Sequence, residues 1–411
     1  MDLQLLKSEI SPKSEIAITG SKSETNRLLL LKALYPNLKL DNRSNSDDSV
    51  VMTSALQSKE MIIDIHHAGT AMRFLTAFFA SQEGREVVLT GSARMQERPV
   101  SILVDALRQL GADIRYEKEE GYPPIRIKGK KLSQSKVNLK ANVSSQYISA
   151  LLLIAPGLEN GLELFLDGEL TSIPYIQMTL SVLHEIGVAT TFEGNRITVS
   201  PKTELADSKA VIVESDWSSA SYYYSIAALA PVGTEIRLTS YKENSFQGDS
   251  ELITIYRHFG VESTFENQTV VLRKITEADK ESLTLDLQNT PDIAQTIAVT
   301  CFGLQRACRL TGLHTLKIKE TDRLLALQNE LTKLGASVTV TDNSLTLDPS
   351  DKINPDVAIS TYQDHRMAMA FAPLALKTTL LIKEAEVVSK SYPGFWEDLK
   401  KIGVKIQEKD A

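Results

Sequence analysis

The chain repeats one pattern, in which an amphipathic helix ends in a glycine and two short alternating strands follow around a polar turn. The clearest copies read TLSVLHEIGVATTFEGNRITVS, LITIYRHFGVESTFENQTVVLR and LQNELTKLGASVTVTDNSLTLD. Across five copies the marker glycines are Gly111, Gly187, Gly260, Gly335 and Gly403, which lie 76, 73, 75 and 68 residues apart. A degenerate first copy is expected at VVMTSALQSKEMIIDI. A repeat of this length indicates a supersecondary unit rather than the shorter repeat of a solenoid.

This repeat predicts the architecture. Each marker glycine suits the position just after a helix, where a left-handed backbone is needed. The strands alternate apolar and polar residues, as at 338–341, so one face of each should be buried. With 411 residues the chain is long enough for at least two domains. We therefore expect an α/β fold of six βαβαββ-like units, three in each domain.

A second helix in each unit is apolar nearly all round, as in SSQYISALLLIAPGL, WSSASYYYSIAALAPVG, TPDIAQTIAVTCFGL and DHRMAMAFAPLAL. Such helices are expected to be buried. Their charged and hydroxyl residues gather at the N-terminal ends, which we expect to meet at a solvent-accessible cleft.

Five helices are predicted to begin beside an arginine, near Arg27, Arg73, Arg98, Arg323 and Arg366. A helix N-terminus carries roughly half a positive charge, so a cation there is mildly unfavourable. The free N–H groups of helix starts bind phosphate and carboxylate, and a guanidinium adds a bidentate clamp. The pattern predicts that the chain binds small, highly charged anions.

Composition restricts the class of partner. The net charge of −7 argues against a nucleic-acid partner. Cys301 and Cys308 lie in an apolar run at a spacing that fits neither a metal site nor a disulfide framework, so we expect both to be buried. The first residues lack a signal-peptide pattern and no apolar run reaches membrane-spanning length. A cytoplasmic protein with no membrane partner is expected.

Eight short motifs carry the candidate side chains: GSKSETNR, HAGTAMR, RMQERP, SSQY, TPDIAQT, KETDR, DHRMAM and KSYP. Taken singly, each is also compatible with a capped helix, a tight turn or a surface ion pair. Asp292 is either an acid stabilised by a helix dipole or a general base beside a substrate hydroxyl. Adjacent His66 and His67 cannot chelate one metal in strand geometry, so no metal is expected.

In this order the motifs resemble the enolpyruvyl transferases, and among them the 5-enolpyruvylshikimate-3-phosphate synthases, from Gly20 to Trp396. The resemblance implies two inverted α/β domains of three repeats with the substrate cleft between them, one at 20–215 and the other at 1–19 plus 216–411. It implies transfer of the enolpyruvyl group of phosphoenolpyruvate to the 5-hydroxyl of shikimate 3-phosphate, with release of phosphate. Neither a metal nor an organic cofactor is implied, and we expect a monomer.

The resemblance also implies a role for each matching residue. Asp292 would take the proton from the 5-hydroxyl, and Glu320, with Lys22, would handle the proton at the methylene carbon of phosphoenolpyruvate. The implied contacts of shikimate 3-phosphate are Lys22, Ser23, Arg27, Ser144, Ser145, Ser172, Tyr175, Asp292 and Lys319. The implied contacts of phosphoenolpyruvate are Lys22, Gly69, Arg94, Gln146, Arg323, Arg366 and Lys390.

Two positions depart from the family pattern, because His67 and Thr315 stand where the family usually has asparagine. Two other functions remain open. The sister transferase that acts on UDP-N-acetylglucosamine has asparagine after its first lysine and uses a loop cysteine, whereas here Ser23 follows Lys22. A non-catalytic sugar-phosphate-binding protein would need the cations but neither Asp292 nor Glu320.

Overall fold

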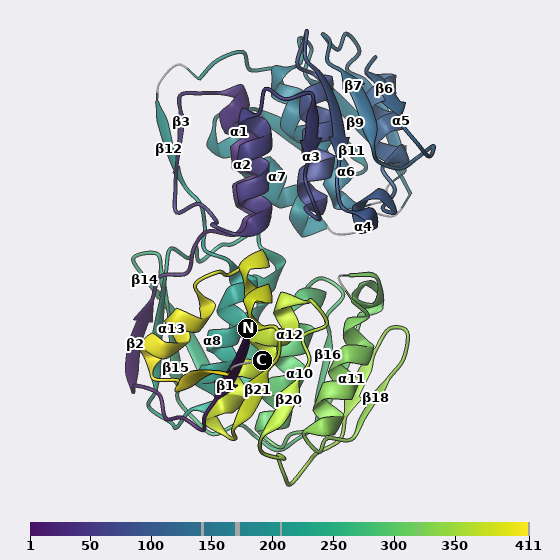
Figure 1. The fold of residues 1–411 in the computed structure, drawn as a ribbon. Helices are drawn as coiled ribbons and strands as arrows, with labels where there is room; N and C mark the ends of the chain where they lie inside the picture. The colour runs from purple at the N-terminus through teal and green to yellow at the C-terminus, as the bar shows by residue number, and fades with distance from the viewer. Residues whose placement is uncertain (141–143, 169–172, 206–207, 320, 410–411) are drawn as a thin grey trace. The chain divides into compact units, whose positions relative to one another are not determined.

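The computed structural model describes residues 1–140, 144–168, 173–205, 208–319 and 321–409. It divides into two compact units (Figure 1). The terminal unit comprises residues 1–19 and 214–411, and the inserted unit comprises residues 20–213. Each unit encloses a hydrophobic core of its own. Within the described ranges, no helix is both long and apolar enough to cross a membrane.

Three sheets form the outside of the inserted unit. One has the order β4-β5-β7-β6, with strands at Ile62–Asp64, Glu86–Thr90, Ile125–Lys128 and Asp113–Tyr116. The next has the order β8-β9-β11-β10, with strands at Lys136–Lys140, Leu162–Asp167, Arg196–Val199 and Thr190–Glu193. The third pairs β3 (Leu38–Asp41) with β12 (Lys209–Ile212).

The terminal unit has three four-stranded sheets. The first has the order β2-β13-β15-β14, at Lys13–Ile16, Glu235–Thr239, Thr269–Lys274 and Val261–Glu266. The second has the order β16-β17-β19-β18, at Leu283–Asp286, Cys308–Thr311, Leu345–Leu347 and Val338–Val340. The third has the order β20-β21-β1-β22, at Val357–Ile359, Leu380–Ile382, Asp2–Leu5 and Ile406–Lys409.

All five four-stranded sheets share one topology, which confirms the repeat. Two parallel strands come first, as in β8 and β9, and an antiparallel pair from the hairpin after the marker helix completes the sheet. The last copy has only one strand after its helix, and β1 from the chain start supplies the other. The degenerate first copy was predicted wrongly in part, because its expected strand at 62–64 is β4, which pairs with β5 in the next sheet.

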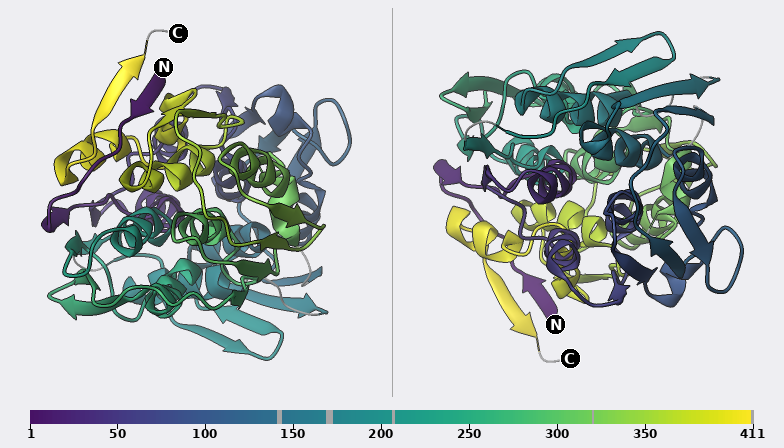
Figure 2. Two further views of the ribbon diagram at one scale, coloured as in Figure 1. Left: turned by 90° about the horizontal axis from the view of Figure 1, so that it is seen from below. Right: turned by 90° about the horizontal axis from the view of Figure 1, so that it is seen from above.

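The helices gather inside these sheets, as both views of Figure 2 show. Those of the inserted unit are α1 (Lys22–Leu34), α2 (Asp47–Gln57), α3 (Gly69–Ala80), α4 (Ala93–Gln96), α5 (Ser101–Gln109), α6 (Ser145–Ile154), η1 (Ala155–Gly157) and α7 (Ile173–Glu185). Those of the terminal unit are α8 (Trp217–Leu229), η2 (Gly248–Glu251), α9 (Leu252–Ile255), η3 (Tyr256–Phe259), η4 (Pro291–Ile293), α10 (Ala294–Gly303), η5 (His314–Ile318), α11 (Arg323–Lys333), α12 (His365–Phe371), η6 (Ala372–Leu376), η7 (Ala385–Lys390) and α13 (Phe395–Ile402). The apolar helices α6, α8, α10 and α12 are buried, as expected.

Buried polar contacts show that the central helices of each unit run in the same direction. In the inserted unit, Arg27 near the start of α1 donates to Ser149 near the start of α6 and to Thr179 in α7. In the terminal unit, Ser221 of α8 bonds to Thr296 of α10, and four residues further along both helices Thr300 donates to Ser225. Because equivalent turns meet, the N-terminal ends of these helices lie together at one end of each unit.

The marker glycines have the backbone conformation that the repeat predicts. All five have a positive φ, from 74° at Gly260 to 113° at Gly403. At Gly260 space is restricted as well, because a Cβ atom would lie 2.0 Å from the carbonyl oxygen of Thr276. Gly233 in the same unit has a φ of 96°, and a Cβ there would meet nothing within 4 Å.

We predict that Gly260→Ala destabilises the protein by about 3 kcal/mol, because left-handed strain and steric overlap add. Gly233→Ala is the matched control, and strain alone should cost about 1 kcal/mol. The midpoint of urea unfolding measures both. Equal losses for the two variants would show that the contact with Thr276 has no energetic role.

Candidate functional site

The inserted unit brings together the polar starts of α1, α3 and α6. Gln146 in the first turn of α6 donates its side-chain amide to Thr70 of α3, at 3.3 Å. Ser144 caps α6 by accepting from the backbone N–H of Gln146, and Ser145 follows it with a buried side chain. Three helix starts with hydroxyl and amide donors therefore lie at the same end of this unit.

Lys22 is the first residue of α1. Its ammonium group lies 3.4 Å from the carboxylate of Asp48 in α2, and 28% of its side chain is exposed. Lys22 is thus a partly exposed cation held at a helix start. The sequence motif GSKSETNR identified the lysine but not the aspartate that holds it.

Arg27 lies deeper than its motif suggested. The helix α1 begins five residues earlier than predicted, at Lys22, so Arg27 is in its second turn and 3% exposed. Its guanidinium donates to the carbonyl of Ser23 at 2.7 Å, to Thr179 at 2.8 Å and to the carbonyl of Tyr175 at 3.3 Å. Burial lowers the pKa of Arg27 to about 10, so the group stays charged at neutral pH. Arg27 ties Ser23 and Tyr175, two predicted contacts of a substrate, to one buried cation.

Arg73 is also not at a helix start, because α3 begins four residues earlier, at Gly69. The buried guanidinium donates to the carbonyls of Gly69 and Pro99. Arg73 therefore holds the end of the RMQERP motif against the start of α3.

Gly69 is a point of close approach, and the guanidinium of Arg98 lies against it. A Cβ atom at Gly69 would lie 2.5 Å from a guanidinium nitrogen of Arg98, so a larger residue would displace that side chain. Arg98 precedes α5 by three residues instead of opening it. Arg94, in α4 just before Arg98, has a side chain that is 77% exposed, and it pairs with Glu97. The sequence motif pointed to Arg94, whereas the contact of Arg98 with α3 has no signal in the sequence.

In the terminal unit, three cations converge on the carboxylate of Asp292 in η4. Lys319 and Arg323 lie 3.4 Å and 2.9 Å from its Oδ1 atom. Arg366 lies 3.4 Å from its Oδ2 atom. The side chain of Asp292 is 16% exposed and that of Lys319 is 34% exposed, so solvent reaches the cluster.

Asp364 fixes two of these cations. Its Oδ2 atom accepts from the Nε of Arg323 at 2.6 Å, and its Oδ1 atom accepts from the backbone N–H of Arg366 at 2.8 Å. Arg323 opens α11, and Arg366 is the second residue of α12, where Asp364 is the cap. These two arginine positions at helix starts are as predicted.

Four other residues that the sequence singled out remain to be placed. Lys390 donates to the carbonyl of Gln363, next to the start of α12. The hydroxyl of Thr315 in η5 is buried and has no hydrogen-bond partner within the described ranges. Ser172 and Glu320, both predicted to take part, lie outside the described residues.

A further acid, Asp249 in η2, belongs to this cluster, and the sequence analysis missed it. Asp249 and Ser218 at the start of α8 form a short hydrogen bond, and Ser218 accepts from Arg366 at 3.2 Å. Burial and the Asp292 carboxylate raise the pKa of Asp249 to about 6. Although burial opposes the charge of Arg366, the carboxylates of Asp292, Asp249 and Asp216 hold its pKa well above the ordinary value.

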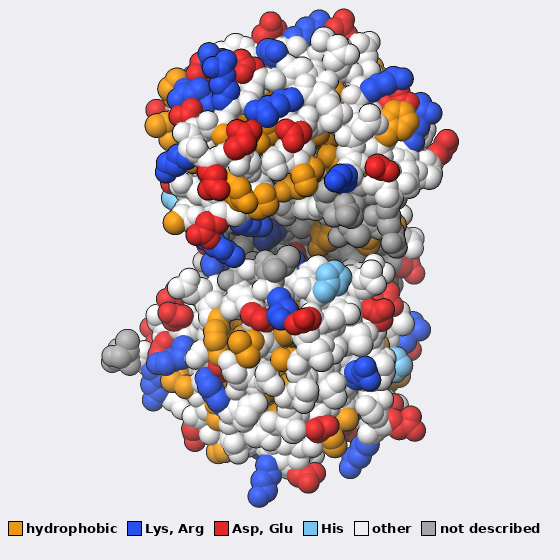
Figure 3. Space-filling view, turned by 90° about the vertical axis from the view of Figure 1, so that its right-hand side faces the viewer, with side chains coloured by type: hydrophobic (Ala, Val, Ile, Leu, Met, Phe, Trp, Pro, Cys, Tyr) orange, Lys and Arg blue, Asp and Glu red, His pale blue; other side chains and the backbone are white. Residues whose placement is uncertain are grey.

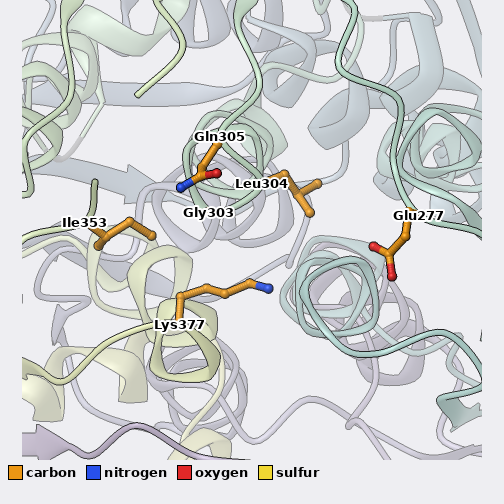
Figure 4. A pocket seen from close by; sticks show the side chains of 6 residues that line it. All are labelled: Glu277, Gly303, Leu304, Gln305, Ile353 and Lys377. Atoms are coloured by element: carbon orange, nitrogen blue, oxygen red, sulfur yellow. The ribbon is translucent and has the colours of Figure 1, made fainter. Parts of the chain in front are cut away.

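One cavity of about 440 Å³ lies at the other end of α10, lined by Glu277, Gly303, Leu304, Gln305, Ile353 and Lys377 (Figure 4). It adjoins the C-terminal end of a helix, where the dipole disfavours anions. Asp292 precedes the opposite end of α10, so this cavity is separate from the cation cluster.

The two cysteines, Cys301 and Cys308, are buried and free, as expected. Among the described residues, no group of three or more His, Cys, Asp or Glu side chains is arranged to hold a metal ion. His66 is solvated, with 66% of its side chain exposed.

Chemically, the terminal unit presents a carboxylate among cations, and the inserted unit presents helix starts with a lysine, hydroxyls and amides. On the face in Figure 3 acidic and basic side chains are interspersed. The cations at these helix starts suit ligands that carry phosphate and carboxylate groups. A carboxylate beside them is suited to accept a proton from a bound hydroxyl.

Comparison with known proteins identifies the family. The 3-phosphoshikimate 1-carboxyvinyltransferase of Bacteroides fragilis is 45% identical over 408 residues, which cover 98% of both chains. The protein of the same name from Colwellia psychrerythraea is 35% identical, covering 94% of this chain and 96% of its own. The solved structure of the EPSP synthase of Acinetobacter baumannii shares the fold, with a TM-score of 0.83, 21% identity and 99% coverage of both chains. Residues 35–399 match the family EPSP synthase (3-phosphoshikimate 1-carboxyvinyltransferase), and the chain belongs to this family.

Proposed function

We propose that this chain transfers the enolpyruvyl group of phosphoenolpyruvate to the 5-hydroxyl of shikimate 3-phosphate, with Asp292 as the general base. The cluster around Asp292 carries the proposal, because it combines a carboxylate with Lys319 and with two arginines at helix starts. Family membership and 45% identity to a named relative support the same reaction. The reaction belongs to the shikimate pathway, which leads toward chorismate and the aromatic amino acids.

The proposal assigns residues of both units to the two substrates. For phosphoenolpyruvate these are Lys22, Gly69, Arg94, Gln146, Arg323, Arg366 and Lys390. For shikimate 3-phosphate they are Lys22, Ser23, Arg27, Ser144, Ser145, Ser172, Tyr175, Asp292 and Lys319. Each substrate carries a phosphate and a carboxylate, so several cations are needed to place the two anions side by side.

The reaction proceeds by addition and then elimination. The 5-hydroxyl oxygen bonds to the central carbon of phosphoenolpyruvate while Asp292 takes the hydroxyl proton, and a proton is added to the methylene carbon. The resulting tetrahedral intermediate then loses that proton and phosphate, which restores the double bond. Glu320 and Lys22 are assigned to the proton at the methylene carbon.

Ligand binding should make Asp292 a stronger base. In the structure its carboxylate is shared by Lys319, Arg323 and Arg366, and nearby cations stabilise the ionised form of an acid. A substrate carboxylate that takes over Arg323 and Arg366 would withdraw part of this stabilisation. Asp292 would then accept a proton more readily when both substrates are present.

The residue after Lys22 and the positions of the two cysteines favour shikimate 3-phosphate over UDP-N-acetylglucosamine as the acceptor. Ser23 follows Lys22, and both cysteines are buried in the terminal unit, where neither lies in a loop beside the cation cluster. We also propose a monomer in the cytoplasm, where buried free thiols remain reduced.

A phosphate-release assay tests the activity. Phosphate should appear only when phosphoenolpyruvate and shikimate 3-phosphate are both present, and omission of either should abolish release. Release with UDP-N-acetylglucosamine in place of shikimate 3-phosphate would favour the sister transferase. Binding of either substrate without any turnover would favour a non-catalytic protein.

We predict that Asp292→Asn lowers kcat by about a thousandfold, because the loss of a general base typically costs 10²–10⁴. Calorimetry should show that shikimate 3-phosphate still binds. Asp342→Asn is the control, since Asp342 is an exposed acid of the same unit that pairs with Lys317. Near-normal phosphate release by Asp292→Asn would remove Asp292 as the base.

We also predict that Arg94→Ala and Arg366→Ala each raise KM for phosphoenolpyruvate about tenfold or more, because each removes a charge-assisted hydrogen bond to that substrate. KM for shikimate 3-phosphate should change far less. Arg115→Ala, which removes an exposed arginine paired with Asp113, is the control. Equal increases in both KM values would contradict the assignment of these arginines to phosphoenolpyruvate.

A further inference from the structure

One hydroxyl, that of Ser218, links Asp249 to the cation cluster. Ser218 accepts a hydrogen bond from the Nη2 atom of Arg366 at 3.2 Å. The same hydroxyl forms the short hydrogen bond with the carboxyl group of Asp249. The connection therefore runs from Asp249 through Ser218 to Arg366.

Asp249 does not serve as the cap of α8, although it lies beside the start of that helix. The cap of this helix is Asp216, which accepts from the backbone N–H of Ser219 at 2.7 Å. Gln247 accepts from the backbone N–H of Trp217 at 3.0 Å. Asp249 instead comes from η2 and bonds to the side chain of Ser218, so its contact bears on where that hydroxyl proton points.

We propose that Asp249 is a positioning residue for Arg366 and thereby for phosphoenolpyruvate, acting through the hydroxyl of Ser218. When Asp249 is ionised, Ser218 donates its proton to the carboxylate and presents a lone pair to Arg366. When Asp249 is protonated, its O–H can donate to Ser218, and the carboxyl group no longer has a negative charge that holds the hydroxyl proton of Ser218 toward it. The ionised form is then the one that holds Arg366 in place.

The charges around Asp249 set the pH at which this change occurs. Burial and the carboxylates of Asp292 and Asp216 oppose its ionisation, whereas Arg366 and the bond from Ser218 favour it, and the resulting pKa is about 6. Glu251 is exposed on η2, and the adjoining helix α9 carries only Leu, Ile and Thr. Above pH 6 Asp249 is mainly ionised, so positioning of Arg366 should weaken as the pH falls through 6.

The inference rests on the proposed function, and steady-state phosphate release by the full chain tests it. Asp249→Asn should raise KM for phosphoenolpyruvate about fivefold at neutral pH, because a hydrogen bond to a charged group is weakened indirectly. KM for shikimate 3-phosphate should stay within about twofold, since Arg366 is assigned to the other substrate. Glu251→Gln, on the same 3₁₀ helix, is the control and should match the unmodified chain.

The pH profile separates positioning from a structural effect. For each pH, kcat/KM for phosphoenolpyruvate of the unmodified chain is divided by that of Asp249→Asn. This ratio should fall toward one below pH 6. Ionisation of the substrate affects both values equally and so cancels in the ratio. Ser218→Ala should give the same KM increase and the same profile, and it carries the test if Asp249→Asn does not fold. The double variant should lose no more than either single variant.

A ratio that is constant with pH, equal increases in both KM values, or additive losses in the double variant would each overturn the role of Asp249. If the unmodified chain released no phosphate from the two substrates, the proposed function itself would fail. The two failures are therefore distinguishable.

Discussion

The carboxylate of Asp292 neutralises Lys319, Arg323 and Arg366 together, and the arrangement of the terminal unit's helix starts depends on it. Arg323 is 2% exposed on its side chain, and a guanidinium buried to this degree needs a hydrogen-bonded anion. Asp292 and Asp364 supply that anion. The same pairing surrounds the Asp292 carboxylate with cations, which stabilise the ionised form of an acid. An anionic substrate that competes for the arginines would change the pairing of Arg323 and the stabilisation of Asp292 together.

The repeat explains why these cations lie close together. Each βαβ crossover places a helix against its sheet in the same sense, so that the buried helices of a unit run parallel. Their N-terminal ends then meet at one end of the unit, where dipoles and free N–H groups add to the charge of Lys and Arg side chains. The unfavourable meeting of several positive helix ends is offset by acids such as Asp292, Asp364 and Asp249. The cation cluster and its internal acids thus follow from one topology.

The sequence predicted the features that depend on a few neighbouring residues, such as the ends and the capped starts of helices. The marker glycines have positive φ because a left-handed residue ends each helix, and Arg323 and Arg366 lie at helix starts because Asp322 and Asp364 cap α11 and α12. The starts of α1 and α3 were misplaced because neither has a side-chain cap. The contact of Asp249 with Ser218 and that of Arg98 with Gly69 join residues about 30 positions apart, and no periodic pattern encodes such contacts. Likewise, β1 completes a sheet whose other strands lie more than 350 residues away.

A crystal structure of the chain with shikimate 3-phosphate and a non-reactive analogue of phosphoenolpyruvate tests the central claim most directly. The distance between Oδ1 of Asp292 and Nη1 of Arg323 is 2.9 Å without ligand. The account predicts that it lengthens beyond about 3.5 Å, outside hydrogen-bond range, with a carboxylate oxygen of the analogue on Arg323 and the 5-hydroxyl beside Asp292. An unchanged pair between Asp292 and Arg323, with both ligands bound elsewhere, would contradict it.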